Sequence, residues 1–576
     1  MRPTPRHVLS SASMALVLGA CGEGPQPPEV LASALYETEF LQRPGRVAFR
    51  EETCWIGARA WLHVGAIGVG TLRVEVAMDG LDDTVLLDTT LTGGIRSETL
   101  ELPGTDPRPL IITLKSTGDV TLLAFAVQEL RAPAQPPPTR LPGSMRGRNV
   151  VVFVADSLHA EHLSGYGYER DTSPYIDRIA EAGVRFRYAY SQTSWTLSSV
   201  SSLFTSVEQE RHGVLELDQR LGDEFSTLAE LFSSAGYRTV GLIQNGIIWP
   251  ATGLDRGFAE YTIFPWHTEG TRQLMARAVE VMLEVSDDPF FLYVHLTPPH
   301  QPYQPPASFR ELYLDPEYDG EVDGSIISCA IVAKASPPAG DPDVRRLAAL
   351  YDGHIRYVDD QIGNALRAML GAGRLNELLV VVTSDHGEAF LQHGAQGHNS
   401  HVYEEMVRIP LVFYAPESPI PVGQVVDAPV TLLDVMPTLI DLCALEPPRH
   451  RLRGASLVGL LESHGASVRS RPESFVPRSI FMTSRYKDDP AKLHAAIRIG
   501  RHKLVTRGGR AFLYDLVADP GETEDLAAQR PVHARVLEHR LDAWYADATS
   551  RDSAAETVAL DPARRQAIRA LGYGGK

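Results

Sequence analysis

Residues 149–156 read NVVVFVAD, an unbroken apolar run that ends in a carboxylate. Such a run is typical of a strand that is buried on both faces of a parallel sheet. Similar runs occur at 289–296 (PFFLYVHL) and 376–384 (NELLVVVTS), and helical patterns cover 171–183 and 343–370. Strands that alternate with helices predict an α/β fold with helices on both faces of a mostly parallel sheet.

The residues before this part of the chain have a strand-like pattern without helices. Apolar and polar residues alternate in 71–80 (TLRVEVAMDG), and the alternation stops at an Asp-Gly pair. Residues 110–130 read as two strands around a turn at 117–119 (TGD). We therefore predict an N-terminal all-β sandwich over residues 46–131.

Composition gives the remaining boundaries. The Pro-rich stretch 132–147 predicts an exposed linker, and the α/β domain then covers 148–464. The tail, 465–576, contains a short strand pattern at 494–506 and a final helix. These features predict a small C-terminal α+β subdomain.

The N-terminus has the features of an export signal. Basic residues precede an apolar run, Val8–Ala20, that is too short to span a bilayer. The ending LGAC resembles the bacterial lipobox, which predicts a lipoprotein signal peptide (1–20), a lipid on Cys21 and a flexible tether (21–45). The alternative is an ordinary signal peptide that is cut near an unrelated cysteine. We expect an exported bacterial lipoprotein, anchored to a membrane through Cys21, in the periplasm or at the cell surface.

Composition also limits the partners and the cysteine chemistry. The 576-residue chain is 44% hydrophobic and carries a net charge of -18, which argues against a nucleic-acid partner. Lipidation of Cys21 would leave Cys54, Cys329 and Cys443. An odd number of cysteines without paired spacing predicts neither a disulfide framework nor a cysteine zinc site.

Polar residues that directly follow apolar runs are candidate site residues, because open α/β sheets bind ligands beyond the carboxyl ends of their strands. Asp156 ends one run, and Asp385 and His386 end another. Thr196 begins a predicted helix within 191–206 (SQTSWTLSSVSSLFTS), where free N–H groups and the helix dipole suit an anion. Each residue also has a simpler interpretation, because Thr and Asp are common helix caps.

Six motifs stand in order along the chain: VVVFVADSLHAEHLSGYGYERDTSPYIDRIAEAGVRF, WTLSSVSSLFTS, PFFLYVHLTPPHQPY, YDGHIRYVDDQIG, TSDHGEAFLQHGAQGHNSHVYEEMVRIPLVFYAP and LYDLVADPGETEDL. Read together, they resemble the sulfatase family of the alkaline phosphatase superfamily over about residues 148–530. The resemblance implies an alkaline-phosphatase-like fold and a hydrolase of sulfuric or phosphoric esters.

The resemblance implies roles for the residues that match family positions. It implies one divalent metal ion, Ca²⁺, Mn²⁺, Mg²⁺ or Zn²⁺, held by Asp156, Asp385 and His386. Thr196 matches the position of the nucleophile and would be a fourth ligand. A metal ion there would lower the pKa of the hydroxyl and polarise the ester that is attacked.

The sequence departs from the family at several of these positions. The family's nucleophile is a Cys or Ser that is oxidised to formylglycine within a C-x-P-S-R pattern, whereas here the run is TLSSV, with Thr196 first and Val200 in place of the arginine. Ser157 stands where the family often has a second acid, and His159 where it often has an arginine. The family also holds sulfate with two lysines. Between Lys115 and Lys487 this sequence has only Lys334, which lies outside the motifs, so these two lysines are missing.

Histidines are the residues expected to replace these cations. We expect His300 and His398 to act in catalysis and in substrate binding. His159 and His401 are expected as further substrate contacts. His295 and His393 are weaker candidates, because a single histidine is more often a surface or hydrogen-bonded residue than a ligand contact.

Three functions stay open at this point. The first is a metal-dependent hydrolase of an anionic sulfate or phosphate ester in a glycan, lipid or small molecule. The second is a transferase of a phosphate-bearing head group, because the set Asp, Thr, Asp, His resembles lipoteichoic acid synthases and phosphoethanolamine transferases. The third is a non-catalytic surface lipoprotein that binds glycan through its β domain.

Overall fold

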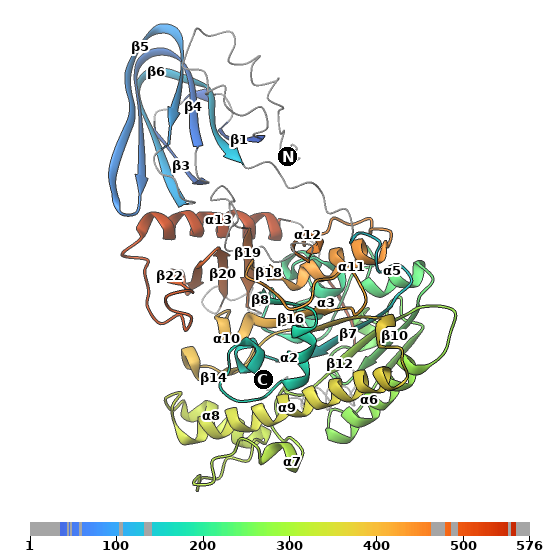
Figure 1. Ribbon diagram of the computed structural model, residues 1–576. Helices are drawn as coiled ribbons and strands as arrows, with labels where there is room; N and C mark the ends of the chain where they lie inside the picture. Colours follow the sequence, from blue (N-terminus) through green and yellow to red (C-terminus); the bar gives the residue numbers. More distant parts are fainter. Residues whose placement is uncertain are drawn as a thin grey trace.

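The computed structural model describes residues 35–42, 45–46, 49–56, 60–102, 108–131, 141–461, 478–484, 493–550 and 555–559. The predicted signal peptide and Cys21 lie outside these residues. Figure 1 shows an N-terminal sheet, a large α/β part and a C-terminal part whose helix α13 contacts the N-terminal sheet. No helix within the described stretches is long and apolar enough to cross a bilayer.

A nine-stranded sheet forms the centre of the α/β part, in the order β11-β10-β12-β7-β13-β16-β8-β17, with β18 beside β8. Neighbouring strands are parallel from β11 to β13, and β16 is antiparallel to both of its neighbours. The predicted mostly parallel sheet is therefore confirmed. Its strands are β7 (Asn149–Ala155), β8 (Val184–Tyr190), β10 (Arg238–Ile243), β11 (Glu260–Ile263), β12 (Phe290–Leu296), β13 (Leu378–Thr383), β16 (Arg408–Tyr414), β17 (Gln424–Val426) and β18 (Val430–Thr431).

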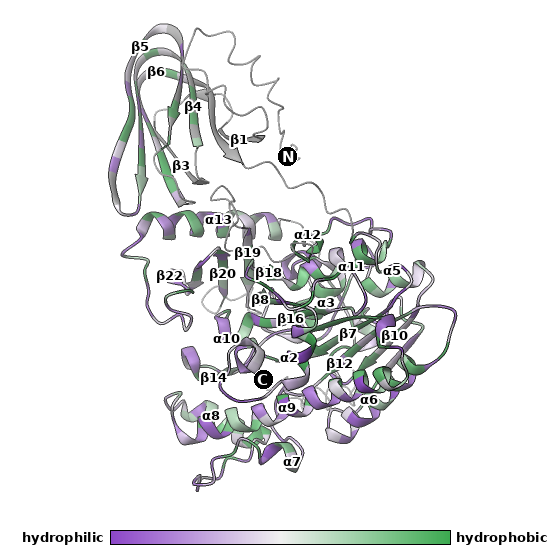
Figure 2. Ribbon diagram, in the orientation of Figure 1, coloured by the Kyte–Doolittle hydropathy of each residue, from purple (hydrophilic) through white to green (hydrophobic). Residues whose placement is uncertain are grey.

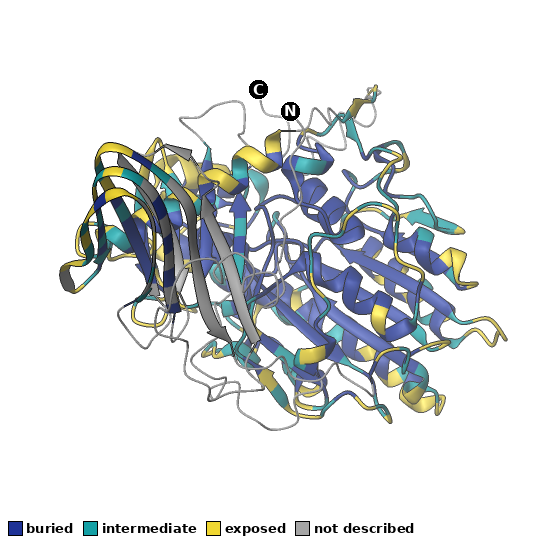
Figure 3. Ribbon diagram, turned by 90° about the horizontal axis from the view of Figure 1, so that it is seen from above, coloured by how far each residue is buried: buried dark blue, intermediate teal, exposed yellow. Residues whose placement is uncertain are grey.

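Strand β7 contributes to two hydrophobic cores, because successive side chains of a strand point to opposite faces of the sheet. Val152 and Val154 pack in the core that includes helices α3, α5 and α11. Val151 and Phe153 pack in the core that includes α2, α6 and α9. Both faces are covered, so the central strands are apolar (Figure 2) and buried (Figure 3). These helices are α2 (Pro174–Glu181), α3 (Thr196–Thr205), α5 (Leu228–Ser234), α6 (Thr268–Leu283), α9 (Pro342–Gly371) and α11 (Val435–Cys443).

Short elements connect these layers near the edges of the sheet. Two of them, β14 and β15, form a small antiparallel pair after β13. Their bounds are α4 (Gln209–His212), α7 (Ala307–Arg310), α8 (Ile326–Ala335), α10 (Glu404–Val407), α12 (Val458–Leu461), β14 (Ala389–Phe390), β15 (Gln396–Gly397), η1 (Ala160–His162), η2 (Ser164–Tyr166), η3 (Pro250–Thr252), η4 (Leu375–Glu377), η5 (Gln392–Gly394) and η6 (Leu432–Asp434).

The N-terminal region is all-β, as predicted, but its six strands form one antiparallel sheet and not the two sheets of the predicted sandwich. The long strand β6 pairs with β1, β2 and β3 along one edge and with β4 along the other. Apolar side chains of this curved sheet form a core of their own. The strands are β1 (Leu35–Gln42), β2 (Gly45–Arg46), β3 (Phe49–Ile56), β4 (Ala60–Met78), β5 (Leu81–Glu101) and β6 (Arg108–Arg131).

The predicted turn at 117–119 is wrong, because β6 runs through it as a single strand. Gly118 lies opposite Gly70 of β4, and both glycines have positive φ, 84° and 153°. A Cβ atom on Gly118 would lie 2.3 Å from the carbonyl oxygen of Val69. The glycine therefore permits a close approach inside a continuous ladder, and a turn-like sequence marks an irregular point in the strand.

Two predicted connecting segments are shorter than expected. Strand β1 lies within the stretch predicted as a tether, where it completes the edge of β6. Leu141 and Met145, in the predicted linker, are fully buried in the core that includes α3 and α11. The amides of Gly143 and Met145 also donate to carbonyls at the end of α11. The linker prediction failed here because composition does not reveal these two anchoring apolar residues.

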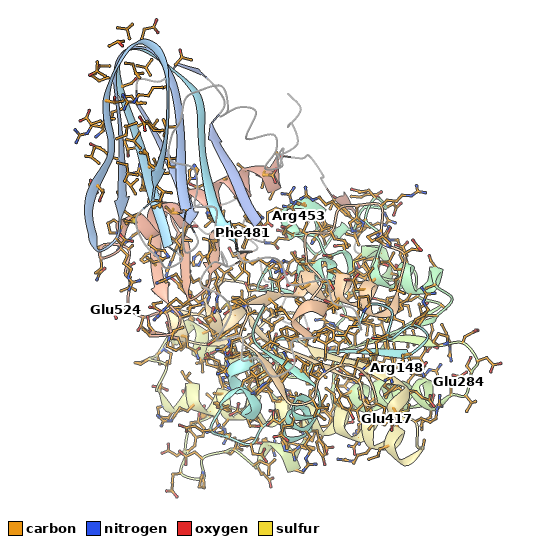
Figure 4. All side chains as sticks on the ribbon, turned by 45° about the horizontal axis from the view of Figure 1, so that its top comes forward. Arg148, Glu284, Glu417, Arg453, Phe481 and Glu524 are labelled. Carbon is orange, nitrogen blue, oxygen red and sulfur yellow. The ribbon has the colours of Figure 1, made fainter. Side chains whose placement is uncertain are left out.

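The C-terminal part is a four-stranded antiparallel sheet covered by helix α13, which confirms the predicted α+β subdomain. Phe481 of the sheet, labelled in Figure 4, stacks on Trp544 of α13, and their ring centroids are 4.6 Å apart. A short strand, β23 (Glu556–Thr557), returns to pair with β9 (Gln219–Arg220) of the α/β part. The other elements are β19 (Ser479–Thr483), β20 (His494–Ile499), β21 (His502–Arg507), β22 (Arg510–Asp515) and α13 (Pro531–Thr549).

Candidate active site

The structure brings three separate segments together at the carboxyl edge of the central sheet. Asp156 directly follows β7, while Asp385 and His386 follow β13, and these two strands are parallel neighbours. Thr196 is the first residue of α3. All four side chains are fully buried. The rule that placed candidate residues after strand ends therefore predicted the main groups of one site.

Hydrogen bonds hold both carboxylates in fixed orientations. Asp156 accepts from the hydroxyl of Ser157 at 3.1 Å and from the amide of Asn245. Asp385 accepts through Oδ1 from the backbone N–H groups of Ser157 (3.1 Å) and His386 (3.0 Å). Its other oxygen, Oδ2, has no hydrogen-bond partner among the described residues. A buried anionic oxygen without a donor is suited to a metal ion.

The ring of His386 presents one nitrogen to this site. Its Nδ1 lies 2.9 Å from the carbonyl oxygen of Gly387, which can only accept a hydrogen bond, so Nδ1 carries the proton. Its Nε2 lies 3.7 Å from Asp156, 3.6 Å from Asp385 and 3.2 Å from the hydroxyl of Thr196. This tautomer is the one that a metal-binding histidine requires.

His295, considered above only as a weak substrate contact, belongs to the same cluster. It lies on β12, and its Nε2 is 3.5 Å from Asp156 Oδ2. Ligand atoms of His295, Asp156 and Asp385 all lie within 4.8 Å of one another. These three residues fit a divalent cation, and His386, whose Nε2 lies 3.7 Å from Asp156 and 3.6 Å from Asp385, adds a second imidazole beside the same carboxylates.

Thr196 is not the cap of its helix. The N-cap position belongs to Trp195, whose side chain makes no capping hydrogen bond, and Thr196 occupies the first helical position. The Thr196 hydroxyl instead lies next to His386 Nε2. The interpretation of Thr196 as a plain N-cap is therefore wrong. Its hydroxyl lies beside His386, one of the four residues (Asp156, Asp385, His386 and His295) that form what we call the carboxylate cluster.

Two of the predicted substrate histidines adjoin this cluster. The centroid of the His398 ring lies 4.6 Å from the centroid of the His386 ring and 4.7 Å from that of the His300 ring. His398 Nδ1 lies 3.0 Å from a carboxylate oxygen of Glu388. Burial and the neighbouring His386 lower the pKa of His398 to about 3, and burial raises the pKa of Glu388 to about 7. Burial opposes ionisation of Asp156, but the rings of His300, His295 and His386 outweigh it and hold its pKa below the usual range.

The other predicted histidines lie in different surroundings. His159 packs near His162 and donates its backbone N–H to Tyr351, and neither of its ring nitrogens has a hydrogen-bond partner among the described residues. His401 and His393 both approach Glu405, at 3.5 Å and 2.8 Å. These contacts do not test the role of His159 and His401 as substrate contacts, which stays a prediction.

Two site residues were missed by the sequence analysis. Asn245 comes two residues after β10, so the strand-end rule would have found it if 238–243 (RTVGLI) had been identified as a strand. Glu388 stands in the quoted SDHGE motif, but only the fold shows that it contacts His398. The site therefore draws on the ends of β7, β10, β12 and β13, which are adjacent in the sheet.

The sheet topology and this cluster together define a hydrolytic enzyme of the alkaline phosphatase superfamily. Residues 148–444 match the family model "Sulfatase", and residues 395–544 match "N-sulphoglucosamine sulphohydrolase, C-terminal". The chain therefore belongs to the sulfatase family.

Individual relatives agree with this assignment. The human N-sulphoglucosamine sulphohydrolase is 29% identical over 55% of this chain and 64% of its own length. An arylsulfatase of Clostridium perfringens is 24% identical over 56% of this chain and 80% of its own. The phosphonate monoester hydrolase of Agrobacterium radiobacter has the same fold, with a TM-score of 0.56 and 22% identity over 69% of this chain and 96% of its own.

Proposed function

We propose that this sulfatase-family enzyme is a metal-dependent hydrolase of sulfate or phosphate esters outside the cytoplasm, with Thr196 as its nucleophile. The observation that carries the proposal is the position of the Thr196 hydroxyl, 3.2 Å from His386 Nε2 and at the start of α3. Asp156, Asp385, His386 and His295 are the residues that would hold the metal ion. A bound divalent ion would supply Lewis acidity to the hydroxyl and to the ester.

In the first step, Thr196 Oγ1 forms a bond to sulfur or phosphorus while the bond to the leaving oxygen breaks. The hydroxyl proton passes to the leaving oxygen, and we expect His398, whose ring adjoins that of His386, and His300 beside it to relay this proton. Water then attacks the same sulfur or phosphorus atom, which releases sulfate or phosphate and restores the hydroxyl. This second attack is needed because a threonine ester cannot collapse as a formylglycine hydrate does.

The substrate is proposed to be a singly or doubly charged ester of a glycan, a lipid or a small molecule. Two relatives are named for N-sulphoglucosamine and for aryl sulfates, which supports a sulfated substrate. Neither a lysine nor an arginine is among the described groups that pair with Asp156, Asp385 or His386. The histidines of the site would therefore contact the anion in place of the missing cations.

Substitution of Thr196 tests the proposal directly. Thr196→Ala should lower turnover by about a thousandfold or more, roughly 4 kcal/mol in the barrier, because the covalent step is lost. Thr196→Ser keeps the hydroxyl and should retain measurable turnover. The assay panel is an aryl sulfate, a phosphate monoester, a phosphodiester and a phosphonate. Parental turnover by Thr196→Ala with the metal ion still bound would show that an activated water, not Thr196, is the nucleophile.

A transferase is the second candidate, because threonine takes the place of the residue that becomes formylglycine. If the threonine ester is passed to an acceptor, glycerol or a glycan should raise turnover above the rate with water alone. Turnover that is independent of acceptor concentration would favour hydrolysis.

Absence of turnover on the whole panel, in the protein with bound metal, would favour a non-catalytic surface protein.

A further inference from the structure

His295 contributes a second nitrogen to the carboxylate cluster, and it comes from a different strand than the other groups. β12, which carries His295, pairs with β7, so His295 lies opposite Val154, two residues before Asp156. Its side chain is fully buried, its Nε2 lies 3.5 Å from Asp156 Oδ2, and its ligand nitrogen lies within 4.8 Å of a carboxylate oxygen of Asp385. The cluster therefore has two imidazoles, His295 and His386, beside its two carboxylates.

The distances in this cluster are those expected between ligands of one ion. Four pairs are separated by 3.2 to 3.7 Å: His295–Asp156, His386–Asp156, His386–Asp385 and Thr196–His386. Most of them are longer than a normal hydrogen bond, which is about 2.7 to 3.2 Å. Ligands placed tetrahedrally at about 2.0 to 2.1 Å from an ion are roughly 3.4 Å apart. The groups are thus spaced for a shared ion more than for direct hydrogen bonds.

Both imidazoles also have a partner that can set their tautomer. His386 Nδ1 donates to the carbonyl of Gly387, and His295 Nδ1 lies 2.9 Å from the hydroxyl oxygen of Tyr293. When Nδ1 carries the proton in each ring, Nε2 is the nitrogen left to bind an ion, and it lies 3.5 Å from Asp156 in His295 and 3.7 Å from Asp156 in His386. Partners of this kind orient histidine ligands in metal sites and raise their basicity.

We infer that the site selects a first-row transition metal of the Zn²⁺ type over Ca²⁺, and that His295 is one of its ligands. The inference rests on the metal site of the proposed function and adds the identity of the ion. Imidazole nitrogen suits Zn²⁺, whereas Ca²⁺ takes six to eight oxygen ligands. The oxygens of the cluster are those of Asp156, Asp385 and Thr196, with the Ser157 hydroxyl 3.1 Å from Asp156, and the two imidazoles add nitrogens, which Ca²⁺ does not favour.

Metal binding by the stripped protein tests the inference without an activity assay. Zn²⁺ and Ca²⁺ are titrated separately into chelator-treated protein, and affinity is measured by calorimetry and by the shift in Tm. Zn²⁺ should bind about a hundredfold or more tightly than Ca²⁺. His295→Asn should weaken Zn²⁺ binding by about tenfold or more and leave Ca²⁺ binding nearly unchanged. The matched control is His212→Asn, because His212 is also buried but bonds to Ser202 and Val214.

X-ray absorption of the Zn²⁺-loaded parent protein gives a second readout that does not depend on the folding of a variant. Two imidazole ligands are expected, and a single one would overturn the role of His295. Equal or tighter binding of Ca²⁺ would overturn the choice of ion while leaving the proposed metal site intact. Failure of every ion to bind would instead overturn the metal site itself.

Discussion

Ser157 joins the two carboxylates of the site. Its hydroxyl donates to Asp156 and its backbone N–H donates to Asp385, and it adopts a left-handed conformation with a φ of 62° to do so. Non-glycine residues in this conformation are uncommon and are concentrated at functional sites. The serine that stands where the family often has a second acid thus has a defined role, since it orients the remaining acids without adding a third charge.

Glu210 gives a prediction at the residue scale that concerns pH. Its side chain is buried and accepts a hydrogen bond from the hydroxyl of Thr483, and burial raises its pKa from 4.5 to about 7. The folded state therefore binds this proton more tightly than the unfolded state. Its contribution to stability is complete below about pH 4.5 and is lost as the pH rises through about 7.

Through this group, the free energy of unfolding should fall by up to roughly 3 kcal/mol between pH 5 and pH 7.5, and Glu210→Gln should remove that fall. The free energy of unfolding, measured by urea titration at several pH values, checks this. The control is Glu524→Gln at an exposed position (Figure 4), which should keep the parental slope. An unchanged slope in Glu210→Gln would show that Glu210 is ionised in the folded protein.

At the scale of elements, the N-terminus of α13 is capped from a distant part of the chain. Asp79, in the turn between β4 and β5, accepts from the backbone N–H groups of Val532 at 3.0 Å and of His533 at 2.8 Å. A carboxylate at this end of a helix satisfies free donors and interacts favourably with the helix dipole. One residue therefore connects the N-terminal sheet to the C-terminal helix.

Asp79→Ala should destabilise this contact by about 1 kcal/mol, the usual cost of losing a cap. We expect faster limited proteolysis around α13 and a lower Tm for the part that contains it. Asp83→Ala, in β5 at an exposed position, is the matched control and should behave as the parent. Equal proteolysis rates for both variants would mean that the contact does not hold the two parts together.

At the scale of the whole molecule, a buried ion cluster connects the C-terminal subdomain to the α/β part. Lys503 is fully buried, and its Nζ lies 2.9 Å from Glu404 and 3.0 Å from Glu522. Glu404 also accepts from the hydroxyl of Tyr190, at the end of β8. Tyr190 lies six residues before Thr196, so the subdomain supports the segment that leads to the nucleophile.

Lys503→Met should lower the free energy of unfolding by about 3 kcal/mol or more, because two carboxylates would stay buried without their cation. Chemical denaturation measures this loss. Lys334→Met, the same change at an exposed lysine of α8, should alter stability by less than about 0.5 kcal/mol. Similar losses in both variants would contradict the stabilising role of Lys503.

The attachment of the whole molecule is a prediction that rests on the sequence alone. We propose that Cys21 carries a lipid, because LVLGAC follows a short apolar run at the N-terminus. Cys21→Ser should move the protein from the membrane fraction to the soluble fraction of its host. Retention in the membrane fraction after this change would place the anchor elsewhere.

The sequence by itself determined the periodic features of the fold. Strands β7, β12 and β13 and helices α3 and α9 lie where apolar runs and helical spacing predicted them, because such patterns reflect local burial. The same reasoning found Asp156, Thr196, Asp385 and His386, since strand ends and helix starts can be recognised locally. It failed at 117–119, where a glycine lies within a long strand.

Only the tertiary structure decided which distant residues meet. The order of the strands sets β10, β12 and β7 side by side, and this order brings Asn245 and His295 to Asp156. The same packing turns His401 toward Glu405 and leaves His398 beside His386. Strand order and side-chain burial depend on long-range pairing, which a local pattern of residues does not encode.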